Sequence, residues 1–296
     1  MVHIPMPAPL GRADLHTHTT ASDGTLPPAE HVRWAAETGL AALGVTDHDT
    51  IHGWDEAFAA GKALSIEIVP GCELSTEVGT TEVHILAYYF DREEPEMVEL
   101  LHRMRGGRRA RAGESVAKLQ RLGYTGVSLD RVLELGGEAV GRPHIAAVMV
   151  EQGIVRTVKD AFDRFLARGK PAYVPRPKLT PEEAIATVKR AGGVPVVAHP
   201  GLIRDDKWVR HFIAAGVMGI EAYHSDHSED QRQFYARWAA DAGLICTGGS
   251  DSHGPTGPRT VTPGSVNVPL DVVAQLKKAS RACQEGLFRH VLPAEE

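Results

Sequence analysis

The stretch Asp14-Leu15-His16-Thr17-His18 carries two histidines one residue apart, and Asp23 follows five residues later. Successive side chains of a strand point to opposite faces, so His16 and His18 share one face of the short strand expected over residues 12–18. Two imidazoles that lie a few ångströms apart on one face suit a transition metal better than a packed core. We therefore expect a metal site at the end of this strand.

Histidines and carboxylates recur along the chain, mostly where a hydrophobic run ends. A single such histidine is as readily explained as a solvated or hydrogen-bonded residue, but the whole set favours a polynuclear metal site. The candidate ligands are His16, His18, Asp23, His48, Glu73, His84, His199, Asp251 and His253. One ion cannot use so many ligands, so two or three divalent ions are expected, with Glu73 placed to bridge them. Mixed imidazole and carboxylate ligands suit Mn, Zn or Fe without choosing among them.

The composition is that of an ordinary globular protein of 296 residues with a formal charge of −6. That charge argues against a broad polyanion-binding surface, so stable binding of duplex DNA is not expected, although a local basic patch stays open. Three cysteines without a CxxC pair fit a reducing cytoplasm. Neither a signal peptide nor a membrane-spanning run is recognisable, and we expect a cytoplasmic protein with no membrane partner.

Short apolar runs that read as strands alternate with helical patterns along most of the chain. The expected strands are 12–18, 40–46, 65–70, 82–90, 194–198, 218–222 and 244–248. Polar candidates follow nearly every strand, which is typical of a parallel barrel whose site lies at the carboxyl ends of its strands. Seven strands predict an α/β fold of the distorted (β/α)7 barrel type. An open doubly wound sheet is the alternative, but no Gly-rich dinucleotide motif follows the first strand.

Residues 95–180 interrupt this alternation with mostly helical periodicity. We interpret them as a helical insertion that covers the active site. The barrel is then formed by residues 12–94 and 181–296.

Four motifs together resemble those of the polymerase and histidinol phosphatase (PHP) superfamily: Asp14-Leu15-His16-Thr17-His18, Thr46-Asp47-His48, His199-Pro200 and Ser250-Asp251-Ser252-His253. The resemblance implies the same distorted barrel and a trinuclear site. It implies one metal on His16, His18, Glu73 and Asp251, a second on Glu73, His84 and His199, and a third on Asp23, His48 and His253. We expect Asp23, His48 and His253 to be catalytic.

The motif Gly141-Arg142-Pro143-His144, inside the helical segment, resembles small stand-alone phosphoesterases of that superfamily. These hydrolyse nucleoside 3′,5′-bisphosphates, and some relatives trim RNA 5′ ends. The resemblance therefore implies a metal-dependent phosphoesterase that hydrolyses a phosphate monoester of a small nucleotide, or a short RNA, with metal-activated hydroxide. A 5′–3′ exonuclease, a histidinol phosphatase, an amidohydrolase-like enzyme and a non-catalytic PHP module are the alternatives.

A phosphate monoester needs cations to hold its oxygen atoms. The candidate substrate-binding residues are Arg142, His144, Lys170, Arg108, Arg111 and His227. The arginines between residues 103 and 111 can equally form a solvated helix face, and Lys170 can be an ordinary surface lysine. His227 can instead be hydrogen-bonded behind the site.

Overall fold

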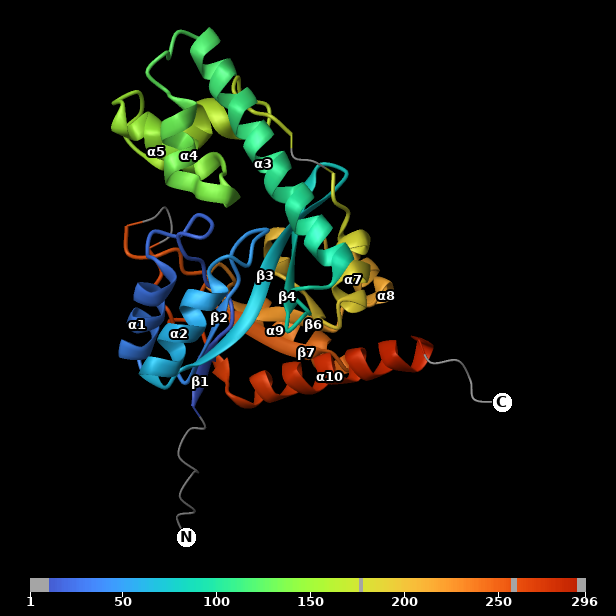
Figure 1. The fold of residues 1–296 in the computed structure, drawn as a ribbon. Helices are drawn as coiled ribbons and strands as arrows, with labels where there is room; N and C mark the ends of the chain where they lie inside the picture. Colours follow the sequence, from blue (N-terminus) through green and yellow to red (C-terminus); the bar gives the residue numbers. More distant parts are fainter. Residues whose placement is uncertain (1–10, 176–177, 257–259, 292–296) are drawn as a thin grey trace.

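The computed structural model describes residues 11–175, 178–256 and 260–291, and its centre is a single sheet (Figure 1). The described residues form eight strands in this sheet. In spatial order they are β7 (Ile245–Gly249), β6 (Gly219–His224), β5 (Val194–Val197), β4 (Thr81–Tyr88), β3 (Glu67–Val78), β2 (Ala42–Val45), β1 (Arg12–Asp14) and β8 (Val268–Pro269).

The sheet curls until β1 meets β7 again. The Leu15 N–H donates to the Gly248 carbonyl at 3.2 Å, and Thr17 forms a parallel bridge with Ser252. These contacts nearly close a barrel, which confirms the expected distorted barrel.

The expectation that all strands are parallel was wrong for β4. Strand β3 does not stop at Pro70 but continues to Val78, and Gly79 and Thr80 turn the chain directly into β4. A two-residue connection can join only antiparallel strands, and Gly79 adopts the positive φ of +59° that such tight turns favour. Strand β4 is accordingly antiparallel to both β3 and β5. Strand β8, which we did not anticipate, is antiparallel to β1.

Six helices of the described residues surround the barrel: α1 (Pro28–Glu37), α2 (Trp54–Leu64), α7 (Pro181–Arg190), α8 (Asp206–Ala215), α9 (Glu229–Asp241) and α10 (Asp271–Val291). The barrel interior is apolar at one end, where Leu15, Val69 and Val196 pack with Val272 and Leu276 of α10. Helix α10 lies across this end of the barrel, leaving the opposite end for polar side chains (Figure 1). Within the described residues, no helix combines the length and apolar character that crossing a membrane requires.

The helical segment stands above that polar end (Figure 1). It comprises α3 (Pro95–Arg121), α4 (Leu129–Gly136), α5 (Arg142–Glu151) and α6 (Val158–Ala161), which runs into a π-helical turn at Phe162–Leu166. Residues from Ala112 to Ala172 form a hydrophobic cluster of their own. The start of α3 instead packs on the barrel through Met97, Leu101 and Met104. Helix α3 therefore connects the two parts, and the division at residues 95 and 180 stays a prediction.

Candidate metal centre

All nine candidate ligands gather at the polar end of the barrel. His16 and His18 follow β1, His48 follows β2, His199 follows β5, and Asp251 and His253 follow β7. Glu73 and His84 come from the middle of β3 and β4, because the hairpin carries both strands past the level of the other strand ends.

The carboxylate of Glu73 lies at the centre of this cluster. Its Oε2 is 3.3 Å from His16 Nε2, 3.2 Å from His18 Nε2 and 2.9 Å from His48 Nδ1. Its Oε1 is 2.7 Å from His84 Nδ1 and 3.0 Å from His199 Nε2. One carboxylate thus faces five imidazoles, which is the position of a bridging ligand.

Two aspartates extend the cluster on either side of His18. Asp251 Oδ1 is 3.1 Å from His18 Nε2 and 3.5 Å from His16 Nε2. Asp23 Oδ1 is 3.4 Å from His253 Nε2, and its Oδ2 is 4.0 Å from His48 Nε2. Donor atoms within 4.8 Å of one another form the groups His16–His18–Asp251, His48–Glu73–His84, His18–Asp23–His48–His253 and His16–Glu221–His224.

The ring of His16 tests whether these residues suit a metal ion. Its Nδ1 lies 3.0 Å from Glu221 Oε1, so Nδ1 carries the proton and Nε2 presents a lone pair. That lone pair faces His18 Nε2 at 3.2 Å. Two imidazole nitrogens so placed need a proton or a metal ion between or beside them, and a divalent metal with nitrogen and oxygen ligands fits the donor set.

The electrostatics of the cluster also favour bound positive charge. Burial acts to lower the pKa of His18, but hydrogen bonds to Asp251 and Glu73 outweigh it and raise this pKa to about 10. Burial acts to raise the pKa of Glu73, yet the surrounding imidazoles of His48, His84 and His16 hold it well below its usual value. Without metal, this site stabilises protonated histidines; the same carboxylates would stabilise divalent cations.

Two buried residues behind the ligands were missing from the sequence-based candidates for metal binding. Glu221 of β6 holds His16 through Oε1 and accepts the His199 N–H through Oε2 at 2.8 Å. His224 Nε2 lies 3.4 Å from Asp251 Oδ2. Glu221 is the one carboxylate in the otherwise apolar residues 218–222, and this isolated position could have marked it as a residue of the site.

Asp47 was quoted in a motif but given no role. Its Oδ1 accepts from the Thr19 N–H at 2.8 Å and from Ser22 Oγ at 2.6 Å. These bonds fasten the loop that carries Asp23 to the loop that carries His48. Asp47 therefore helps to position the candidate ligands Asp23 and His48 through bonds to Thr19 and Ser22.

Backbone strain coincides with the cluster. His199, Asp251 and Asp49 adopt φ values of +26°, +55° and +56°, which residues other than glycine rarely take. Such conformations persist where surrounding contacts enforce them, most often at functional sites. Here the Glu221 bond to the His199 N–H is one such contact.

The two arginines predicted on α3 lie buried beside the cluster. Arg108 Nε donates to Asp49 Oδ2 at 2.6 Å, and its Nη2 donates to Ser75 Oγ at 2.9 Å. Burial acts to lower the pKa of Arg108, but Asp49 and Asp23 outweigh it and raise this pKa. Arg111 is also buried. Arg108 thus joins the helical segment to the loop after His48, and phosphate contact by either arginine stays a prediction.

Arg142 and His144 lie at the start of α5. Arg142 Nη2 donates to Glu82 Oε1 at 2.9 Å, and Glu82 lines the same cavity of about 270 Å³ as Glu73 and His199. His144 Nδ1 accepts from the Gly141 N–H at 3.0 Å. Its side chain lines a larger cavity of about 910 Å³ together with Asp23, so this cavity adjoins the metal centre.

The other two substrate-binding candidates are placed differently. Lys170 is exposed near the end of the helical segment. His227 uses both ring nitrogens in backbone hydrogen bonds, donating from Nδ1 to the Ala222 carbonyl at 2.8 Å and accepting from the Gly201 N–H at 3.1 Å. His227 therefore supports the segment after His199 in this structure, and its contact with substrate stays a prediction.

Comparison with known proteins gives a consistent family. The model of the PHP domain matches residues 14–165. The chain is 39% identical over 82% of its length to a 5′-3′ exoribonuclease of Haemophilus influenzae, covering 90% of that protein. It is 35% identical over 83% of its length to a 3′,5′-nucleoside bisphosphate phosphatase of Chromobacterium violaceum, covering 88% of that protein.

Solved structures agree with these matches. A structure from Bifidobacterium adolescentis, described as a candidate metal-dependent phosphoesterase, has a TM-score of 0.83 and 33% identity, with 92% of this chain and 98% of that one covered. A Chromobacterium violaceum structure described as an amidohydrolase has a TM-score of 0.80 and 33% identity, with 90% and 96% covered. The chain therefore belongs to the PHP domain family and is a metal-dependent phosphoesterase.

Proposed function

We propose that this chain hydrolyses a phosphate monoester of a small nucleotide, with a nucleoside 3′,5′-bisphosphate as the preferred substrate. The observation that carries the proposal is the central Glu73 carboxylate, which faces five imidazoles and is flanked by Asp23 and Asp251. Two or three divalent ions, of Mn, Zn or Fe, would account for these donors.

The division of the residues among the ions follows the one that the family resemblance implies. His16, His18 and Asp251 would hold the first ion, and His84 and His199 the second, with Glu73 shared by both. Asp23, His48 and His253 would hold the third, with His18 close by, and act in catalysis. Divalent ions bound there supply a hydroxide nucleophile at neutral pH and offset the charge that develops on the phosphoryl oxygens.

The surroundings of the cluster support a nucleotide as substrate. The large cavity beside Asp23 has apolar walls formed by Leu135, Pro143 and Phe162, which suit a nucleoside. Arg142 is bonded to Glu82, which lines the metal cavity, so a second phosphate there would compete with Glu82 for the guanidinium of Arg142. The ion pair of Arg108 with Asp49 supports the view that the helical segment covers the site.

Trimming of RNA 5′ ends is the second candidate function. It is favoured by the similarity to the exoribonuclease of Haemophilus influenzae. The same residues would hold the metal ions for both activities, because each reaction would need divalent ions to polarise a phosphate ester.

A phosphate-release screen tests the proposal. Adenosine 3′,5′-bisphosphate, 5′-AMP, histidinol phosphate and a short 5′-phosphorylated RNA are compared with and without added Mn²⁺. A charge-assisted contact to the second phosphate contributes about 1.5–3 kcal/mol, so the bisphosphate should exceed 5′-AMP roughly tenfold or more in kcat/KM. Equal kcat/KM for the bisphosphate and 5′-AMP would contradict a site for the second phosphate. A preference for histidinol phosphate would contradict the proposed nucleotide substrate.

Arg142→Ala should narrow the gap between bisphosphate and monophosphate. Arg131→Ala is the control, because Arg131 pairs with Glu151 inside the helical segment, whereas Glu82, the partner of Arg142, lines the metal cavity. An unchanged gap in Arg142→Ala would contradict the role assigned to Arg142.

A further inference from the structure

The arginines of α3 are not equivalent in the folded chain. Arg103 pairs with Glu183 of α7, and Arg108 pairs with Asp49. Arg105 and Arg109 line, with His102, a separate cavity of about 470 Å³. This cavity shares no lining residue with the metal cavity.

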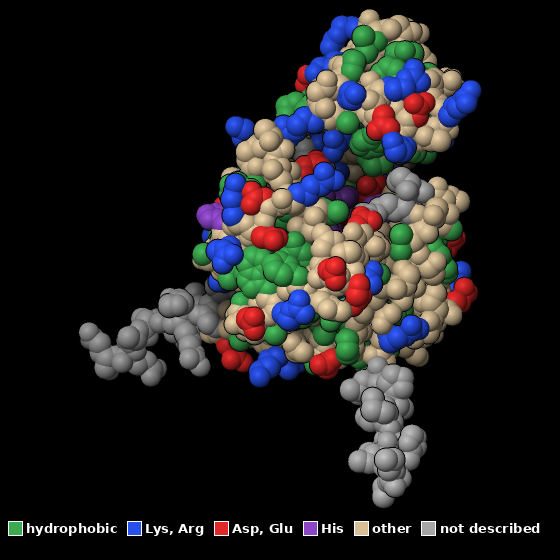
Figure 2. All heavy atoms as spheres, turned by 180° about the vertical axis from the view of Figure 1, so that it is seen from behind, with side chains coloured by type: hydrophobic (Ala, Val, Ile, Leu, Met, Phe, Trp, Pro, Cys, Tyr) green, Lys and Arg blue, Asp and Glu red, His purple; other side chains and the backbone are tan. Residues whose placement is uncertain are grey.

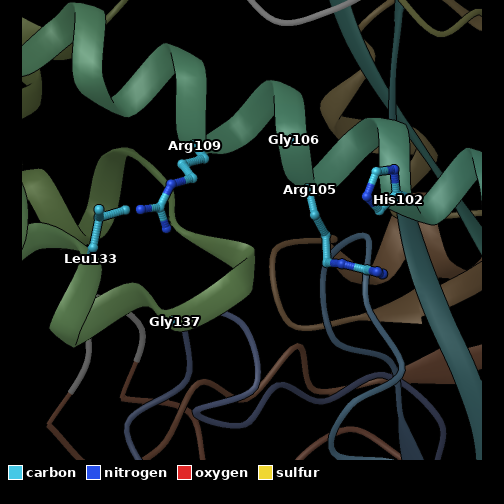
Figure 3. Close-up of a pocket in the computed structure, with 6 residues that line it drawn as sticks. All are labelled: His102, Arg105, Gly106, Arg109, Leu133 and Gly137. Carbon is cyan, nitrogen blue, oxygen red and sulfur yellow. The ribbon is translucent and has the colours of Figure 1, made fainter.

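The cavity lies between α3 and the α4 end of the helical segment (Figure 3). Arg109 reaches towards Leu133, while Arg105 extends towards the loops of the barrel. Among the residues whose side chains the structure describes, the cavity is lined by three basic side chains and by no carboxylate: His102, Arg105, Gly106, Arg109, Leu133 and Gly137. A Cβ added at Gly106 or Gly137 would meet no atom within 4 Å, so the backbone is open to a ligand at both glycines.

The position of the cavity relates it to the metal centre. Arg108, which contacts Asp49 directly after His48, lies between Arg105 and Arg109 on the same helix. At about 1.5 Å of rise per residue, Arg105 and Arg109 stand within roughly one turn of that contact. Arg105 also lines a neighbouring cavity with Ile51 and His52, which belong to the loop after His48.

Seen from the opposite side, Lys and Arg side chains border the hollow between helical segment and barrel, and His and acidic side chains lie within it (Figure 2). Arg105 adds local positive charge beside the loop after His48, although the chain as a whole carries a charge of −6. Planar guanidinium groups bind phosphate oxygens in bidentate fashion, and His102 adds a third donor.

We propose that the cavity of His102, Arg105 and Arg109 is a second phosphate-binding site, outside the metal centre. Its ligand is a phosphate group of a nucleotide strand whose terminal phosphate lies on the metals, or inorganic phosphate released there. The proposal rests on the proposed function, because only a phosphoesterase brings such groups to this edge.

Binding of a cleavage-resistant strand tests the site. A fluorescent, 5′-phosphorylated 2′-O-methyl phosphorothioate strand of six nucleotides is titrated with the metal-loaded protein by anisotropy at several salt concentrations. The change Arg105→Ala with Arg109→Ala should weaken binding about tenfold, and the slope of log K against log salt should fall by about 0.7 for each lost phosphate contact. Arg121→Ala with Arg131→Ala removes the same charge elsewhere and should change affinity less than twofold.

Competition with inorganic phosphate identifies the source of the group. If inorganic phosphate displaces the strand from the unmutated protein but not from the Arg105/Arg109 variant, the site binds free phosphate. If inorganic phosphate does not displace the strand, the site binds a phosphate of the strand. Two results would overturn the proposal. One is an equal loss of strand affinity in the Arg105/Arg109 and the Arg121/Arg131 double variants, and the other is an unchanged strand affinity in Arg109→Glu alone. Phosphate release by the unmutated protein reports separately on the proposed function.

Discussion

Glu221 holds two candidate ligands at once, and its replacement by glutamine tests whether metal affinity depends on that support. The carboxylate is fully buried and lies 3.0 Å from His16 Nδ1 and 2.8 Å from the His199 N–H. Glutamine has the same shape, but its single amide oxygen can accept only one of these two N–H groups. When the amide oxygen accepts the His199 N–H, the NH₂ group faces His16 Nδ1. The His16 proton then moves to Nε2, the nitrogen that should bind the metal.

The size of the effect follows from these contacts. Losing one charge-assisted hydrogen bond costs about 1.5–3 kcal/mol. Loss of a carboxylate behind a ligating histidine typically lowers metal affinity about 10–100-fold, which is about 1.4–2.7 kcal/mol. Since the two ranges overlap, Glu221→Gln should weaken metal binding about 30-fold and raise the metal concentration needed for half-maximal activity accordingly.

Competition between the protein and a chelator of known affinity measures this change. Glu182→Gln is the matched control, because Glu182 forms an exposed pair with His211 Nε2 at 2.7 Å, away from the cluster. Unfolding curves establish that each variant is folded. A folded Glu221→Gln protein whose metal affinity stays within threefold of the parent would refute the reasoning.

Three further changes test other parts of the structure. Asp23→Asn should remove one metal equivalent by elemental analysis and lower activity at least tenfold; unchanged stoichiometry would leave a binuclear centre. Burial, aided by His18 and His253, lowers the pKa of His31 to about 3. As pH falls below 6.5, the unfolded chain therefore binds a proton at His31 before the folded chain does, and the folded state loses stability. At pH 5 the loss is about 2 kcal/mol, and His31→Leu should abolish that part of the pH dependence in urea unfolding; identical pH dependence would contradict a buried neutral His31. Tyr88→Phe removes the buried donor to the Leu15 carbonyl and should lower the free energy of unfolding by about 1 kcal/mol, measured by the same method.

Local patterns were sufficient for much of the candidate site. His16 and His18 could be assigned to one face because the side-chain period of a strand is two, and all nine candidate ligands do meet at one end of the barrel. The helical character of residues 95–180 was also predictable, because proline at the start of α3 and apolar periodicity are local signals.

The antiparallel direction of β4 could not be predicted from such local signals. Alternating strands and helices suggested parallel pairing, whereas the extension of β3 to Val78 and the turn at Gly79 made a hairpin. The reason is that pairing direction depends on how much chain connects two strands, and the sequence pattern did not show where β3 ends.

Residue types and their spacing were thus enough to predict the barrel class, the residues that meet at its polar end and the family resemblance. Which partner each side chain has was decided only by the tertiary structure: Glu221 meets His16 across 205 positions, Arg108 meets Asp49 across 59, and Arg142 meets Glu82 across 60. Such contacts have no periodic signal, because they arise from the closure of the sheet and the packing of α3 and α5 over its polar end. The same packing separates the buried Arg108 from Arg105 and Arg109, which the sequence presents as one basic run.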